Sequence, residues 1–269
     1  MKAIAFGLTF VLGTAVGVGL VSATQAPPGP KKEEPPFRSL DANLYMQTAA
    51  EYRACCYQAF ALAEERIGQE AIKPSSGAQR AVILDLDETV IDNAVFQSTM
   101  IRNGWAYDQK LWDSWEKDHA AEVGLIPGAK PFIESAQKLG FAAIYITNRN
   151  EKFREGTKAI LERHGIAVPD AQLLMATTTS DKTERRKKVA EMFRIVLHVG
   201  DNLRDLDERF KYNAEKGIAG RKSEVDETKA KFGTEWIILP NPAYGEWAKP
   251  LGKGAKDVDQ LSPAIELKP

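Results

Sequence analysis

Carboxylates and small polar residues directly follow three short apolar runs of the sequence. They are Asp85 and Asp87, Thr147 and Asn148, and Asp201 with Asp205. Asp85 and Asp87 are two positions apart, so their side chains project to the same side of an extended chain. Adjacent carboxylates repel each other unless a cation lies between them, and oxygen ligands suit a hard cation such as Mg²⁺. With Asp201 as a third carboxylate, the pattern predicts a magnesium site.

Short apolar runs alternate with helical patterns in the part of the chain that carries these residues. The runs cover residues 81–84, 141–146, 195–199 and 236–239, and the helical patterns cover 130–139, 153–164 and 181–193. This alternation predicts an α/β fold with a parallel sheet that helices cover on both faces. Ligands of such sheets bind beyond the carboxyl ends of the strands, where the polar residues fall.

Each motif also has a simpler explanation when it is taken alone. A D-x-D pair is common in solvated loops, and Thr147 could cap the next helix. Asp205 follows Asp201 by one helical turn and could lie on an ordinary exposed helix. The occurrence of all three motifs at strand ends favours a shared site.

Composition narrows the classes of function. The chain has 269 residues and a net charge of −1, which gives no bulk attraction for a nucleic-acid polymer or an anionic membrane. The basic run at 182–188 opens a helix and is expected to be mostly a solvated face.

Cys55 and Cys56 are adjacent in a helical pattern, and we expect them to be small buried side chains. P-loop, H-E-x-x-H and G-x-S-x-G motifs are absent from the sequence, which disfavours kinase-type, zinc-hydrolase and serine-hydrolase chemistry.

The N-terminal residues have the pattern of an export segment. Lys2 precedes an apolar run from Ile4 to Val21, and the small residues Ala23 and Ala26 follow. We expect residues 1–26 to be a signal peptide; the alternative is an uncleaved membrane anchor. No cysteine directly follows the apolar run, where a lipid would be attached, so the predicted location is periplasmic or secreted, without a lipid anchor. Membrane contact is expected only through an uncleaved N-terminal segment.

The remaining boundaries follow from composition and periodicity. We expect a proline-rich linker at 27–39, a globular domain at 40–250 and a C-terminal tail at 251–269. Within the domain, residues 78–90 and 128–240 would form the α/β core. Residues 40–75, as one long helix or two, and residues 91–127 would form a helical cap over the site. The oligomeric state stays open, and a homo-oligomer is compatible with the sequence.

The cap region is rich in aromatic residues. Trp112 and Trp115 have helical spacing, which favours packing inside the cap. Phe96 comes soon after the first motif and could line the pocket instead.

The motifs resemble those of a known superfamily. Asp-Leu-Asp-Glu-Thr at 85–89, Thr147, Lys182 at a helix start and Gly-Asp-x-x-x-Asp at 200–205 resemble the four motifs of haloacid dehalogenase (HAD) superfamily phosphatases. Further stretches are similar to the bacterial class C acid phosphatases, the lipoprotein e type of 5′-nucleotidase; they lie at 42–52, 85–93, 111–115, 126–129 and 239–247. The resemblance implies a HAD-like Rossmannoid parallel sheet with a helical cap. Many relatives carry a lipobox cysteine, which this sequence lacks.

The resemblance implies a Mg²⁺-dependent acid phosphatase that hydrolyses small phosphomonoesters, nucleoside 5′-monophosphates among them. Asp85 is the candidate nucleophile, which would form an aspartyl-phosphate. Asp87 would act as general acid and base, while its backbone carbonyl contacts the metal. A non-catalytic storage or ligand-binding protein of the same fold is the alternative function, and a carbon–halogen hydrolase is a third.

Further roles complete the predicted site. Thr147, Asn148 and Lys182 would bind the phosphoryl group, with Lys182 offsetting negative charge. Asp201 would ligate the metal, and Asp205 would orient the groups around it. By the resemblance, Tyr244 would stack on a nucleobase, and Phe96 could cover the other face of the base. The alternative for Tyr244 is a packing role in the C-terminal segment.

Overall fold

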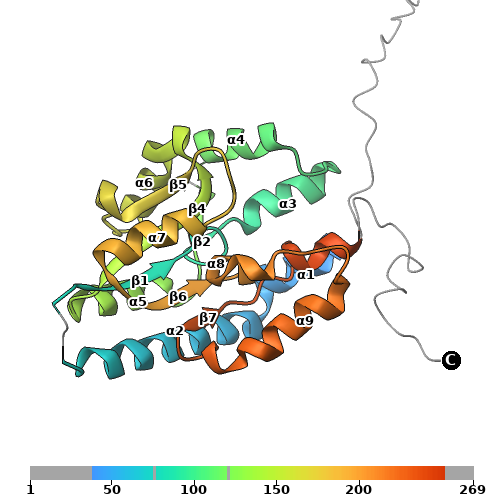
Figure 1. Ribbon diagram of the computed structural model, residues 1–269. Coiled ribbons are helices and arrows are strands. Elements are labelled where there is room, and N and C mark those ends of the chain that lie inside the picture. Colours follow the sequence, from blue (N-terminus) through green and yellow to red (C-terminus); the bar gives the residue numbers. More distant parts are fainter. Residues whose placement is uncertain (1–37, 75–76, 120–121, 252–269) are drawn as a thin grey trace, which may run out of the picture. The chain divides into compact units, whose positions relative to one another are not determined.

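The computed structural model describes residues 38–74, 77–119 and 122–251 (Figure 1). The predicted signal peptide, nearly all of the linker and the C-terminal tail lie outside the described residues. Within the described ranges, no helix combines the length and the apolar character needed to cross a membrane.

A five-stranded sheet forms the centre of the α/β core. Its order is β5-β4-β1-β6-β7, and every neighbouring pair is parallel. The strands are β1 (Arg80–Leu84), β4 (Ala142–Asn150), β5 (Leu173–Ala176), β6 (Arg194–Gly200) and β7 (Trp236–Ile238). This confirms the predicted fold class. Strand β5 was not predicted, because its run is short and only two of its four residues are buried.

Alternate residues of β1 face two separate apolar cores, as the two-residue period of a strand requires. Val82 and Leu84 belong to the larger core. Ala81 and Ile83 face the opposite core, together with Val189 of α7 (Thr183–Met192). The larger core also takes residues from α2 (Ala50–Ala71), α5 (Ala129–Lys138) and α6 (Arg154–Arg163). Helices therefore cover both faces of the sheet, which is the usual environment of parallel strands.

The helical stretch predicted within residues 40–75 is two helices, α1 (Arg38–Thr48) and α2. The backbone turns between them at Ala49, whose ψ of 126° is extended. Helix α2 packs against α5, β6 and β7, so it covers a face of the sheet and is not part of a cap over the site; this corrects the predicted cap boundary. Cys56 is buried in this packing, whereas Cys55 is exposed, contrary to expectation.

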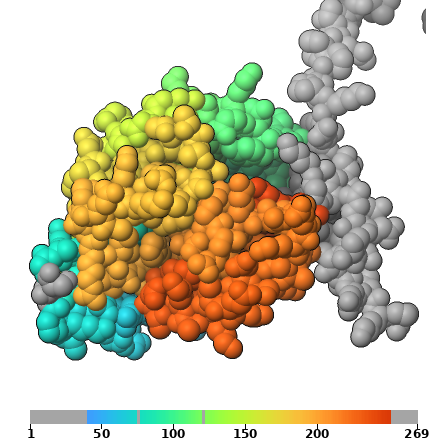
Figure 2. Space-filling model, in the orientation of Figure 1, coloured from blue at the N-terminus to red at the C-terminus, as the bar shows by residue number. Residues whose placement is uncertain are grey.

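The insertion after β1 is closed at its base by a short ribbon. Strands β2 (Ile91–Asp92) and β3 (Gly124–Leu125) pair antiparallel, separately from the main sheet. Between them lie α3 (Ala94–Asn103), which contacts α1, and α4 (Gln109–Asp118), which contacts α6. Figure 2 shows the green surface of the insertion bordering the yellow surface of residues that follow β4. Helices α8 (Leu203–Leu206) and α9 (Gly217–Thr228) follow β6.

Candidate active site

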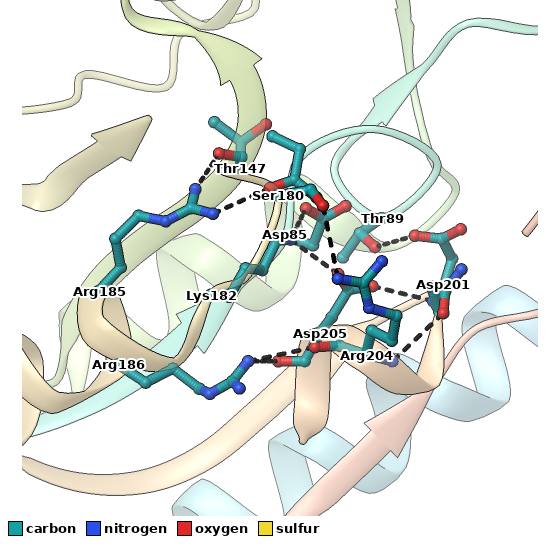
Figure 3. Close-up of polar contacts among 12 residues, drawn as sticks. Asp85, Thr89, Thr147, Ser180, Lys182, Arg185, Arg186, Asp201, Arg204 and Asp205 are labelled. Carbon is teal, nitrogen blue, oxygen red and sulfur yellow. Dashed lines mark hydrogen bonds and ion pairs between the residues drawn. The ribbon is translucent and has the colours of Figure 1, made fainter. Parts of the chain in front are cut away.

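Three strand ends bring most of the predicted residues to one edge of the sheet. Asp85 directly follows β1, and Asp201 directly follows β6. Thr147 lies within β4, which continues to Asn150 instead of ending at the predicted position. Lys182 is the residue before α7 and reaches into this edge (Figure 3).

A buried ammonium group joins two of the carboxylates. Lys182, which is 2% exposed, donates hydrogen bonds from Nζ to Oδ1 of Asp85 and, at 2.7 Å, to Oδ1 of Asp205. Burial acts to lower the pKa of Lys182, but the carboxylates of Asp205 and Asp85 outweigh it, so the pKa is raised and the ammonium stays charged. Burial raises the pKa of Asp85 well above its usual value, and Lys182 opposes this shift. Lys182 therefore favours the ionised form that a nucleophilic carboxylate needs.

Asp205 is fixed by the turn that follows β6. Its Oδ2 accepts the backbone N–H of Asn202 at 2.9 Å, as part of the capping box of α8. A Cβ atom at Gly200 would lie 2.5 Å from the Cβ of Asp205, so only glycine permits this approach. Asp205 is buried, and both its oxygens accept hydrogen bonds, so the exposed-helix alternative is wrong.

Asp201 is held from two sides. Its Oδ1 accepts a hydrogen bond from Thr89 Oγ1 at 3.2 Å, and its Oδ2 accepts one from Asn241 Nδ2 at 2.7 Å. Burial raises the pKa of Asp201 to about 7. Sequence reasoning assigned no role to Asn241, although its position after the last strand offered a signal.

The carboxylates of this edge form a donor set that fits a divalent cation. One oxygen from each of Asp85, Asp201 and Asp205 lies within 4.8 Å of the others. Lys182 supplies one positive charge to Asp85 and Asp205, and burial disfavours the ionised forms of Asp85 and Asp201. A bound divalent cation would offset this excess of negative charge. The side chain of Asp87 lies outside the group, as expected of a residue that would offer its backbone carbonyl.

The side chain of Asp87 instead pairs with a buried arginine. Arg149 donates from Nε to Asp87 Oδ1 at 2.9 Å, and its Nη2 lies 2.8 Å from the same oxygen. Asn93 Nδ2 donates to this oxygen as well, at 2.9 Å. Neither Arg149 nor Asn93 was assigned a role from the sequence. The available signal was the position of Arg149 two residues after Thr147, in the polar stretch that follows the apolar run.

The segment after the apolar part of β4 contacts a second arginine. Thr147 Oγ1 accepts the backbone N–H of Arg149 at 3.1 Å. Arg185 donates to the backbone carbonyl of Thr147 and, at 2.9 Å, to Asn148 Oδ1. The basic run at 182–188 is therefore only partly a solvated face: Arg185 contacts Thr147 and Asn148, and Lys182 contacts the carboxylates at the same edge.

The two predicted stacking residues have different environments. Phe96 is 4% exposed, and its ring centroid lies 5.1 Å from that of Trp112 and 5.5 Å from that of Trp115. Its ring belongs to the apolar core of the insertion, which corrects its predicted role as a stacking surface. Tyr244 is 36% exposed, and its backbone N–H donates to Asn241 Oδ1 at 3.3 Å. Because Asn241 also bonds Asp201, Tyr244 belongs to a segment that is tied to the site.

Comparisons with known proteins indicate the family of this chain. Residues 38–247 match the family model described as HAD superfamily, subfamily IIIB (acid phosphatase). The class C acid phosphatase from Bacillus anthracis has a similar structure, with a TM-score of 0.76 and 32% identity over 86% of this chain and 97% of that chain. A structure of the Bacillus anthracis enzyme with tungstate bound gives a TM-score of 0.74 and 30% identity over the same shares.

These matches separate the predicted functions. They concern phosphatases, so they support neither the carbon–halogen hydrolase nor the non-catalytic alternative. The predicted resemblance is confirmed over nearly the whole described chain. The chain belongs to the subfamily IIIB acid phosphatases of the HAD superfamily, and its reaction is the hydrolysis of small phosphomonoesters.

Proposed function

We propose that this enzyme is an exported, Mg²⁺-dependent acid phosphatase that hydrolyses nucleoside 5′-monophosphates through a phosphorylated Asp85. The observation that carries the proposal is the buried pairing of Asp85 with Lys182 beside Asp201 and Asp205. This arrangement offers an oxygen nucleophile, a fixed positive charge and further carboxylates in one place. Those are the groups that transfer of a phosphoryl group to a carboxylate requires.

In the first step, a carboxylate oxygen of Asp85 attacks phosphorus, and the bond from phosphorus to the ester oxygen breaks. The ester oxygen takes a proton from Asp87 and leaves as the alcohol. In the second step, water attacks the phosphorus of the aspartyl-phosphate and gives its proton to Asp87. Inorganic phosphate leaves, and both carboxyl groups return to their starting states.

Charged and polar groups around Asp85 support binding of the phosphoryl group. Lys182 offsets its negative charge, and the Thr147 hydroxyl accepts one hydrogen bond while keeping its own proton for donation. Asn148 and Arg185 lie next to Thr147, and Arg185 adds a second positive charge near the phosphoryl group. Tungstate, an oxyanion like phosphate, is bound in the related structure.

Asp85, Asp201 and the backbone carbonyl of Asp87 would hold Mg²⁺. Asp205, whose two oxygens are occupied by Lys182 and the backbone of Asn202, would position the groups around it. When bound, the metal would neutralise charge on the phosphoryl oxygens.

The nucleotide preference is proposed from Tyr244. Phosphoryl chemistry needs only the phosphate group, so a preference must come from contacts with the rest of the substrate. The exposed ring of Tyr244 belongs to the segment that Asn241 ties to Asp201. Stacking is tolerant of base identity, so we expect little discrimination between purines and pyrimidines.

Phosphate release from a panel of monoesters tests the proposal. The panel contains purine and pyrimidine nucleotides and small alkyl phosphates, each measured with excess chelator, with Mg²⁺ and with other divalent cations. We expect activity that chelation abolishes and Mg²⁺ restores, with nucleotides as the preferred substrates. Full activity in chelator would exclude the metal, and equal rates for nucleotides and alkyl phosphates would exclude the nucleotide preference.

Export is proposed from the sequence of the first 26 residues. The test is sequencing of the mature N-terminus of the native protein. A start near Pro27 supports cleavage and export, whereas a start at Met1 or Lys2 supports the membrane-anchor alternative.

A further inference from the structure

The carboxyl group of Asp87 is held at only one of its two oxygens. Oδ1 accepts hydrogen bonds from Arg149 Nε at 2.9 Å and from Asn93 Nδ2 at 2.9 Å, and Arg149 Nη2 lies 2.8 Å from it as an ion pair. Among the described residues, no hydrogen bond reaches Oδ2. A carboxylate oxygen has about two lone pairs, so these two hydrogen bonds leave Oδ1 no capacity to bind a proton. A proton on this carboxyl group therefore lies on Oδ2.

Arg149 is itself fixed, so it can hold Asp87 in one orientation. Its side chain is fully buried, and its Nη2 also donates to Asn93 Oδ1 at 3.1 Å. The guanidinium carbon lies 5.5 Å from the centre of the Trp112 ring. Glu116 Oε1 is 4.0 Å from Arg149 Nε, on the side of the insertion. A planar guanidinium with neighbours on several sides has little freedom to move.

Asn93 connects this arrangement to the insertion. Its Oδ1 accepts a second hydrogen bond, from Trp115 Nε1 of α4, at 3.2 Å. Its Nδ2 is the group that donates to Asp87. Trp115 and Arg149 both offer N–H groups, which only the amide oxygen of Asn93 can accept. This fixes the orientation of the amide, so its NH₂ group faces Asp87.

We propose that Arg149, assisted by Asn93, is a positioning residue for proton transfer: it fixes Asp87 through Oδ1 so that Oδ2 presents the proton to the leaving ester oxygen. This inference rests on the proposed role of Asp87 as general acid. Arg149 acts through Asp87 and does not itself touch the substrate.

The leaving group of the substrate provides a selective readout. An alkyl phosphate releases a poor leaving group that needs a proton, whereas a dinitrophenyl phosphate releases a stable phenolate without one. The parameter kcat/KM covers the steps up to release of the leaving group and excludes the later hydrolysis of the aspartyl-phosphate. A defect in proton donation therefore lowers kcat/KM for the alkyl substrate far more than for the aryl substrate. A general structural defect lowers both alike.

The experiment compares kcat/KM for the two substrates in Asp87→Asn, Arg149→Lys and Asn93→Ala. Arg154→Lys is the matched control, because Arg154 pairs with Glu151 at 2.8 Å outside the site. For the alkyl substrate we expect a loss of about 10²- to 10⁴-fold in Asp87→Asn. Arg149→Lys should lose about 10- to 100-fold, since lysine cannot supply two donors in a fixed plane. Both should keep most of their activity on the aryl substrate, and the control should match the wild type on both.

The pattern of losses in these variants decides whether Arg149 positions Asp87. Suppose that Asp87→Asn loses kcat/KM mainly for the alkyl substrate, whereas Arg149→Lys loses it equally for both substrates or for neither. The positioning role of Arg149 is then wrong, and the proposed function stands. If Asp87→Asn itself is not selective, Asp87 is not the proton donor, and the inference falls with that role. Melting curves identify variants that fail to fold. If Arg149→Lys is one of them, Asn93→Ala decides by the same criterion.

Discussion

Replacing Lys182 with methionine tests the charge balance at the centre of the site. Methionine keeps much of the side-chain length but removes the ammonium that bonds Asp85 and Asp205. Because Lys182 is only 2% exposed, the variant leaves two buried carboxylates without their cation. Removing one partner of a buried ion pair costs about 3–5 kcal/mol. In a chain of this size, that corresponds to a decrease of about 6–20 °C in Tm.

The pH dependence of this loss has a defined sign. Burial already raises the pKa of Asp85, and without Lys182 this pKa rises further above that of the unfolded chain. A carboxyl group whose pKa is raised on folding stabilises the protein least at high pH, where it must ionise in the fold. The decrease in Tm should therefore be larger at pH 7 than at pH 5.

The assay is thermal unfolding at both pH values in the presence of chelator, together with kcat/KM in Mg²⁺. We expect kcat/KM to fall by about 10²- to 10³-fold, the range for loss of one group that stabilises transition-state charge. Lys187→Met is the matched control in α7, the helix that follows Lys182, because the ion pair of Lys187 with Glu184 is exposed; we expect no measurable change. An unchanged Tm at pH 7 with kcat/KM within about threefold of the wild type would refute the reasoning.

Three further changes probe other parts of the site. Burial raises the pKa of Glu116 to about 7 from a usual value near 4.5, so the folded protein binds more protons than the unfolded chain between these values and loses stability as pH rises. Glu116→Gln should remove up to about 3 kcal/mol of this pH-dependent loss in the free energy of unfolding, measured by urea unfolding from pH 4.5 to 7. The same pH dependence in the variant and the wild type would contradict the raised pKa of Glu116. Tyr244→Ala should lower kcat/KM for nucleotides by about 5- to 150-fold and hardly affect a small alkyl phosphate, if the ring stacks on the base. Equal losses, or a decrease in Tm that accounts for them, would favour a packing role. Asp201→Ala should raise the Mg²⁺ concentration needed for half-maximal activity, and an unchanged requirement would exclude Asp201 as a ligand.

The sequence predicted the parts of this protein that local patterns encode. The apolar runs identified four of the five sheet strands, because buried parallel strands are apolar on both faces. The placement of Asp85 and Asp201 at one edge was predicted because both directly follow apolar runs, and the carboxyl ends of parallel strands share an edge. The same rule explains why Lys182, which is far away in sequence, comes to this edge.

The rest depends on contacts that no local pattern encodes. Arg149 lies 62 positions from its partner Asp87, and nothing in the intervening sequence shows that a buried arginine would meet it. The role of Phe96 was misjudged because its neighbours Trp112 and Trp115 reach it only through the folding of the insertion. The long helix after residue 50 was placed in the cap because its periodicity indicates a buried face without indicating which partner covers it.

The most direct test of the account is chemical trapping of the phosphorylated enzyme. The enzyme is mixed with a nucleoside 5′-monophosphate and Mg²⁺, quenched in acid during turnover and reduced with borohydride, which converts an aspartyl-phosphate into homoserine. Peptide mass spectrometry then locates the reduced residue, with Asp85→Asn as the control. The account predicts homoserine at position 85 in the wild type and none in the variant. Reduction at another carboxylate, or no reduction during rapid turnover, would contradict Asp85 as the nucleophile.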